Sequence, residues 1–342
     1  MPSWLNQLRW GGAQAGTSLA LASSAWLLSG MTTSPLINSL LPALTTLPAL
    51  LPLRRRSTGF GLQLASALLM IALCVAAIAG FSTRQAWGMA TLLLAALLMA
   101  LGQDLSQLPL QRHVLSSGGL AFRQLRRGSE LGVVAGSLLT GLIVPGVHQF
   151  LPALLLLLPL LPTALQAAAQ QRDNLASSVP PFDSSAALQG LLFGSFFALL
   201  PLWIRSIAAG NCFNFGIVLT GYGIGRSLMA RNVRLPGGVT YLLIAALLMV
   251  CHATPGWLAT SLFIPVGWLA AGCDLQQVER IANDDPAAGW QILQRSGAIG
   301  GLVGILLMGG FAQLVGLAFA LPLQLGLFCL APLVLRSRLQ RR

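Results

Sequence analysis

The sequence predicts an all-α integral membrane protein with twelve transmembrane helices in two parallel six-helix repeats. Charged residues make up only 8% of the 342 residues, and the mean hydropathy is +0.77. A soluble domain of this size cannot hide so much apolar surface. Long apolar runs that do not alternate with polar residues favour helices over an outer-membrane barrel. The third observation is a polar signature that occurs once in each half of the chain.

Each predicted helix is an apolar run of about 20 residues, the length that crosses a bilayer. The first run is interpreted as a helix and not as a cleaved signal, because no clear small-residue cleavage site follows it. Pro145-Gly146 and Pro255-Gly256 predict tight turns between closely spaced helices. The twelve ranges are 14–31, 34–53, 58–80, 87–111, 128–146, 149–170, 186–207, 209–229, 237–254, 256–278, 293–312 and 314–335.

The arginines predict the orientation, because loops on the cytoplasmic side are enriched in positive charge. Twelve crossings with both termini in the cytoplasm put eighteen of the twenty arginines inside and leave only Arg84 and Arg205 outside. One helix more or fewer would destroy this asymmetry. The net charge of +12 is therefore a signal of membrane orientation and does not indicate a nucleic-acid partner. We expect the protein in a bacterial inner (plasma) membrane.

The repeat is visible in three places at offsets of 168 to 170 residues. Gly102-Gln103-Asp104-Leu105-Ser106-Gln107 matches Gly272-Cys273-Asp274-Leu275-Gln276-Gln277. Arg56-Ser57 matches Arg226-Ser227, and the glycine-rich segment from Arg127 matches the one from Arg295. Six helices in each copy give both copies the same orientation.

The longest polar stretch near the middle of the chain predicts a cytoplasmic linker. The expected domains are an N-terminal bundle at 1–170, a linker at 171–185 and a C-terminal bundle at 186–342. All other loops are short, and the sequence contains no nucleotide-binding P-loop, which excludes ATP hydrolysis on this chain as the driving force.

Two parallel six-helix halves joined by a cytoplasmic linker resemble the major facilitator superfamily, and the resemblance covers nearly the whole chain. The family's glycine- and arginine-rich loop motif is similar to Gly221-Tyr222-Gly223-Ile224-Gly225-Arg226 followed by Arg231. Its first copy, at 51–59, lacks the usual aspartate and leading glycine. Gly132, Gly136 and Gly141 resemble the glycine-rich fifth helix that is often pronounced in exporters, although close helix packing explains them more simply.

The resemblance implies a gate at the cytoplasmic end of the halves. In related sugar porters, acidic residues at the inner ends of helices 4 and 10 pair with arginines and hold the halves closed on the inside. A static ion pair without a gating role is the alternative. The implied gate residues are Asp104, Asp274, Arg56, Arg226, Arg112 and Arg280.

The resemblance also implies a central substrate cavity lined by helices 1, 4, 7 and 10. Trp26, Gln103, Phe196 and Trp268 are its candidate lining residues, with helix packing as the alternative for the aromatic side chains. No acidic residue falls at mid-membrane, where a cationic substrate would need a counter-charge. We therefore expect a neutral or amphipathic small molecule.

The predicted function is secondary transport by rocker-switch alternating access. Export is the preferred direction, although the fifth helix lacks the proline of the exporter motif. The alternative is a transporter-derived scaffold or assembly factor for a membrane protein complex. No catalytic cluster is apparent, so we expect no enzyme activity. The five cysteines fit packing roles, and no metal or other cofactor is predicted.

Overall fold

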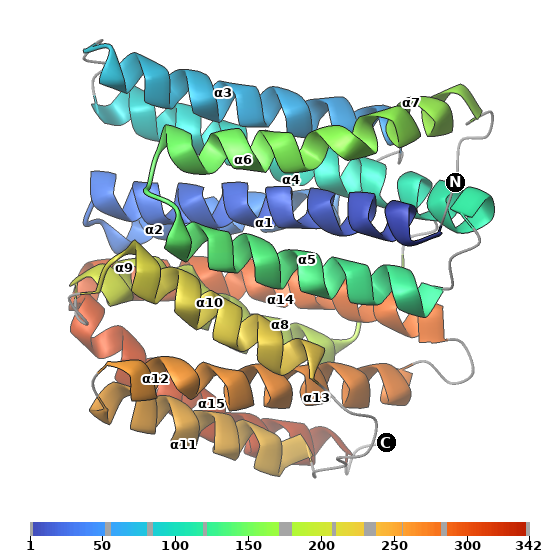
Figure 1. Ribbon diagram of the computed structural model, residues 1–342. Helices are drawn as coiled ribbons and strands as arrows, with labels where there is room; N and C mark the ends of the chain where they lie inside the picture. The colour runs from blue at the N-terminus through green and yellow to red at the C-terminus, as the bar shows by residue number, and fades with distance from the viewer. Residues whose placement is uncertain are drawn as a thin grey trace. The chain divides into compact units, whose positions relative to one another are not determined.

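The computed structural model describes residues 3–51, 56–80, 85–118, 122–170, 180–206, 210–228, 237–254, 256–281 and 286–339. Every regular element in these ranges is a helix (Figure 1). Contacts between Cα atoms divide the chain into two compact units. Unit 1 contains residues 1–33, 51–178 and 210–216, and unit 2 contains residues 34–50, 179–209 and 217–342. The predicted domain boundaries stay a prediction, and most of the predicted linker, residues 171–179, lies outside the described residues.

Unit 1 is a helical bundle built around its first helix, α1, which packs against α4, α5 and α6. A second contact layer joins α3 to α4 and α6. The first residues of α10, up to Gly216, also belong to this unit. Its other elements are α1 (Ser3–Met31), η2 (Ser57–Gly59), α3 (Phe60–Ile78), α4 (Gln85–Gly118), α5 (Phe122–Leu142), α6 (Val147–Leu157), η3 (Leu158–Leu160) and α7 (Leu161–Gln170).

Unit 2 is a second helical bundle, in which α14 packs against α8, α2 and α13. Helix α11 packs against α13 and α15. The elements are α2 (Pro35–Thr46), η1 (Leu47–Leu50), α8 (Ser184–Ala198), α9 (Leu200–Ser206), α10 (Cys212–Ser227) from residue 217 onward, α11 (Gly237–Ala253), α12 (Trp257–Ser261), α13 (Phe263–Ile281), α14 (Pro286–Val315) and α15 (Leu317–Leu339).

Several predicted helices are interrupted where proline removes a backbone donor. The predicted range 149–170 is α6, η3 and α7 in succession, with Pro159 in the short 3-10 turn. The predicted range 186–207 breaks at Leu199, two residues before Pro201. Gly146 and Gly256, the second residues of the two predicted turns, adopt φ angles of 109° and 72° that favour glycine, and Pro255 lies outside the described residues.

Among the described residues, seven helical segments are long and apolar enough to cross a membrane, and two shorter apolar helices accompany them. Their length and composition support the predicted all-helical membrane protein. The predicted ranges 14–31, 128–146 and 209–229 coincide with α1, α5 and α10, which carry too many polar residues or are too short to be counted by that criterion. Helices also extend past the apolar runs: α1 begins at Ser3 and α14 at Pro286, because a helix continues wherever its backbone stays bonded, in lipid or in water.

Candidate functional site

A short ion pair in unit 2 joins Asp274 on α13 to Arg226 at the end of α10. Arg226 Nη2 donates to Asp274 Oδ2 over 2.6 Å, and Gln189 Nε2 donates to Asp274 Oδ1 over 2.5 Å. The Asp274 side chain is 17% exposed and the Arg226 side chain 37%. A charge-assisted contact of this length between partly buried groups is a strong one.

Two tyrosines extend this contact into a network. The Tyr241 hydroxyl on α11 donates to Gln189 Oε1 over 3.3 Å, and Arg226 Nη1 donates to the Tyr222 hydroxyl over 3.4 Å. Gln189 and Tyr241 are buried. The Asp274 network, formed by Gln189, Tyr222, Arg226, Tyr241 and Asp274, therefore links α8, α10, α11 and α13.

Arg280, predicted as a gate residue, pairs with Asp183 in the structure. Its Nη2 donates to Asp183 Oδ1 over 2.6 Å. The same oxygen accepts from the backbone N–H groups of Ser185 and Ala186, so Asp183 is the N-cap of α8. The Asp183 backbone N–H donates to Ser296 Oγ on α14 over 2.9 Å. Asp183 thus ties the beginning of α8 to α13 and α14.

The remaining predicted gate residues lie in unit 1. Asp104 is half-buried on α4, and Arg56 and Arg112 are exposed. The short helix η2 that follows Arg56 packs on α4, because a Cβ added to Gly59 would touch Leu105 Cβ. The structure thus places Arg56 just before the segment that packs beside Asp104.

The four predicted cavity residues divide evenly between the units. In unit 1, Trp26 is buried and stacks on Phe215 with ring centroids 5.7 Å apart. Gln103 Nε2 lies 3.4 Å from Gln14 Oε1. In unit 2, Phe196 lines a pocket and Trp268 is half-buried on α13 outside that lining. A cavity shared by all four side chains stays a prediction.

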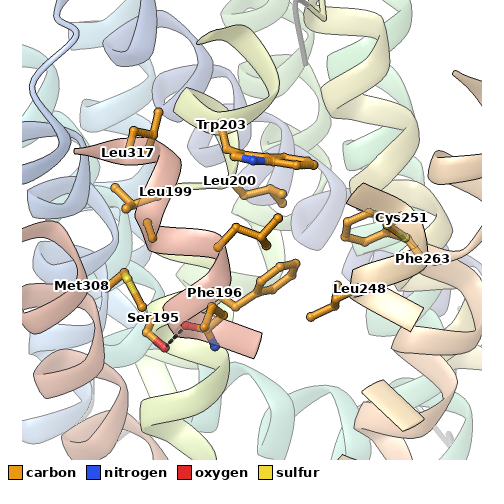
Figure 2. A pocket seen from close by; sticks show the side chains of 13 residues that line it. Ser195, Phe196, Leu199, Leu200, Trp203, Leu248, Cys251, Phe263, Met308 and Leu317 are labelled. Atoms are coloured by element: carbon orange, nitrogen blue, oxygen red, sulfur yellow. Dashed lines mark hydrogen bonds between the residues drawn. The ribbon is translucent and has the colours of Figure 1, made fainter. Parts of the chain in front are cut away.

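The unit 2 pocket has a volume of about 40 Å³ and is mainly apolar (Figure 2). Phe196 and Phe263 stack across it with ring centroids 6.1 Å apart. Its walls also include Leu248 and Cys251 on α11, Met308 on α14 and Gln324 on α15. The sequence argument missed these helices because it considered only helices 1, 4, 7 and 10. Gln324, a lone amide in an apolar run, was the available signal.

Within the described part of the chain, no three His, Cys, Asp or Glu side chains come together as a metal site. The site residues make ion pairs, hydrogen bonds and apolar contacts.

The fold is similar to that of solved transporters. The chain is similar to the nucleoside transporter NupG (a mutant form), with a TM-score of 0.57, 11% identity and coverage of 97% of this chain and 98% of that one. It is similar to the human organic anion transporter MFSD10 (TETRAN), with a TM-score of 0.56, 15% identity and coverage of 98% and 100%. It is also similar to a bacterial homologue of the human lysosomal transporter Spinster, with a TM-score of 0.56, 11% identity and coverage of 96% of this chain and 91% of that one. No protein-family model and no curated protein sequence matches the chain.

Proposed function

We propose that the protein is a secondary transporter that moves a small neutral or amphipathic compound by alternating access between two six-helix halves. The single observation that carries this proposal is the similarity of the fold to solved membrane transporters over 96–98% of the chain. The match also covers 91–100% of the three transporter chains, so it extends over most of each fold. Twelve crossings, a bacterial inner membrane and export as the direction of transport belong to the same proposal.

The Asp274 network is the proposed cytoplasmic gate of unit 2. Asp274 and Arg226 belong to different helices of one unit, so their ion pair fixes the ends of α10 and α13 to each other. Movement of either helix end would lengthen a 2.6 Å contact and expose two charges. The pair therefore favours one arrangement of these helices, and the repeat assigns Asp104 and Arg56 the corresponding role in unit 1.

The proposed substrate is uncharged or weakly polar. Two of the described acidic residues, Asp183 and Asp274, are already engaged by arginines. A cationic substrate that approached either carboxylate would have to break its ion pair. The named neighbours transport nucleosides and organic anions. Of these two classes, the nucleosides fit a neutral substrate.

A flux experiment tests the transporter proposal. The purified protein is screened by thermal shift against neutral nucleosides and neutral lipophilic compounds, and each stabilising compound is then followed in proteoliposomes with and without a proton gradient. We expect saturable flux of at least one compound above that of protein-free liposomes. Absence of flux for every stabilising compound, together with a membrane partner that copurifies stably, would support the scaffold instead.

The gate is tested separately by accessibility of single introduced cysteines at the two ends of the proposed cavity. Asp274→Asn and Asp104→Asn should each shift labelling toward the state with its cytoplasmic end open. Glu130→Gln is the matched control, because Glu130 pairs with Arg126 within α5 and is not a proposed gate residue. Labelling that is the same in both Asp variants and in the unaltered protein would disprove the gate.

A further inference from the structure

The pocket inside unit 2 has two polar ends separated by apolar side chains. Figure 2 shows Trp203 at one end and the hydrogen bond of Ser195 at the other, with Leu200 and Phe196 between them. The pocket is separate from Asp274 itself, because its wall residue Phe263 precedes Asp274 by eleven residues, about 16 Å of helix rise. It lies within unit 2, and of the four predicted cavity residues only Phe196 is in its lining.

The Ser195 end of the pocket satisfies its own hydrogen bonds. The Ser195 hydroxyl donates to Gln324 Oε1 over 2.7 Å, and Gln324 Nε2 donates to the Leu192 carbonyl over 2.8 Å. Both side chains are buried, with exposed fractions of 3% and 2%. This end therefore demands no polar partner from a ligand.

The Trp203 end of the pocket has an unsatisfied hydrogen-bond donor. The indole Nε1–H of Trp203 is buried and has no hydrogen-bond partner among the residues that the structure describes. Of the four such buried polar atoms in the described ranges, it is the one whose residue lines the pocket. Indole nitrogen is only a donor, so the group that completes this end is an acceptor. Buried tryptophan N–H groups usually have such a partner.

The rim of the pocket indicates how a ligand would reach it. Trp203 on α9 and Leu317 and Leu321 on α15 are half-buried, whereas Leu248, Phe263 and Met308 are buried. The pocket therefore comes closest to the surface between α9 and α15. Leu314 and Phe319 flank that rim with exposed fractions of 87% and 59%, so the surrounding surface is apolar. Lipid faces such a surface in a membrane protein.

We propose that this pocket binds the carbonyl-bearing end of a lipophilic molecule that enters from the bilayer, with the carbonyl oxygen accepting from Trp203 Nε1–H. The cavity of about 40 Å³ is room for a group of roughly acetyl size, and the rest of the ligand lies at the apolar rim. The ligand is an uncharged ketone or ester. A free solute and a membrane lipid share this chemistry, and the experiment distinguishes them.

The test compares two probes of nearly equal shape, 4-fluoroacetophenone and 1-ethyl-4-fluorobenzene, by fluorine NMR titration of the purified full chain in detergent. We expect the unaltered protein to bind the ketone more tightly than the hydrocarbon. Trp203→Phe should weaken ketone binding about five- to tenfold, the usual value of one hydrogen bond, and leave hydrocarbon binding within about twofold. Partition into micelles is the same for both proteins and cancels in the comparison.

Trp257→Phe is the matched control, because Trp257 lies on α12 of the same unit, is 69% exposed and is not part of the pocket lining. Its affinities for both probes should equal those of the unaltered protein. A second measurement needs no substitution at Trp203: the ketone should slow modification of Cys251, a pocket residue, by methyl methanethiosulfonate, read by peptide mass spectrometry. Cys74, in unit 1, should be modified at an unchanged rate.

The two ligand sources are separated by repeating the titration with added phosphatidylglycerol. Displacement of the ketone by the phospholipid identifies a membrane lipid as the occupant, and undiminished ketone binding identifies a free solute. Equal affinities for ketone and hydrocarbon without protection of Cys251 would overturn the proposal and leave a void filled by water. The readout is equilibrium binding, so it succeeds or fails independently of any flux measurement.

Discussion

At the scale of single residues, we expect the contacts of the Asp274 carboxylate to contribute to the stability of the fold. Asp274→Asn keeps the shape of the side chain and removes the charge that Arg226 and Gln189 contact. We expect a loss of about 1–3 kcal/mol in the free energy of unfolding, because hydrogen bonds to charged groups are worth that much. Thermal unfolding in detergent measures it as a lower melting temperature.

The control is a double-mutant cycle with Arg226→Gln. Removing both charges should cost clearly less than the sum of the two single changes, because each single change leaves the other charge without its partner. Changes that add within about 0.5 kcal/mol would mean that the 2.6 Å contact contributes nothing to stability.

Asp183 offers a second prediction at this scale, because two of its roles can be separated. Asp183→Ala removes both the N-cap of α8 and the ion pair with Arg280, and should cost about 1–2 kcal/mol. Asp183→Ser keeps a capping oxygen and loses only the ion pair, so it should cost less. Hydrogen exchange of the Ser185 and Ala186 amides, which Asp183 accepts from, reports the difference locally. Equal exchange in both variants would show that the cap contributes nothing.

At the scale of elements, glycines set the distance between helices. A Cβ added to Gly300 on α14 would overlap the carbonyl oxygen of Ala187 on α8. Gly132 on α5 precedes Gly300 by 168 residues, and a Cβ added to it would likewise overlap the carbonyl oxygen of Gly11 on α1. Close approach of backbones supplies the dispersion contact on which helix association in lipid depends.

Gly300→Ala should therefore lower stability by about 1–3 kcal/mol through overpacking. Gly310→Ala on the same helix is the matched control, because nothing lies within 4 Å of its added Cβ. That control should be neutral or stabilising by about 0.5–1 kcal/mol, since alanine favours a helix more than glycine does. Melting temperatures of the two variants measure this difference in stability. A Gly300→Ala variant as stable as the Gly310→Ala control would refute the packing argument.

The sequence predicted these elements better than it predicted their partners. Glycine spacing marked the packing faces of α5 and α14, and hydropathy located the apolar helices. Nothing in the sequence indicated that α2 packs against α14, where a Cβ added to Gly309 would overlap Ser39 Oγ. Contacts between residues 270 positions apart depend on the shapes of both surfaces, which local patterns do not encode.

In the candidate site, too, some residues were predicted from the sequence and their contacts were not. The duplicated aspartate signature and Arg226 were found from sequence because charges are rare in apolar helices, and Arg226 was one of four arginines proposed as partners of the two aspartates. Arg280, another of the four, contacts the N-cap residue Asp183, which was not among the predicted gate residues. The pocket at Trp203 escaped notice because apolar residues that line a void look the same in sequence as residues that fill a core.

At the scale of the whole molecule, the two predicted copies of the repeat have a similar turn conformation as well as similar sequence signatures. Gly146 and Gly316, 170 residues apart, adopt φ angles of 109° and 110°. Both follow a glycine-rich helix, α5 or α14, and both precede the last helical segment of their half. A shared turn conformation of this kind is expected when two halves descend from one six-helix module with the same orientation.

The proposed twelve crossings place both termini on the same side of the membrane, and the distribution of arginines predicts that this side is the cytoplasm. Green fluorescent protein fused after Arg342, or inserted in the predicted linker at 171–179, should therefore fluoresce, because it folds only in the cytoplasm. Alkaline phosphatase fused at Gly80 should be active, because that turn follows the third predicted crossing and so lies outside. An active phosphatase after Arg342 would mean an odd number of crossings. The two halves would then run in opposite directions, and alternating access between parallel repeats would be impossible for this chain.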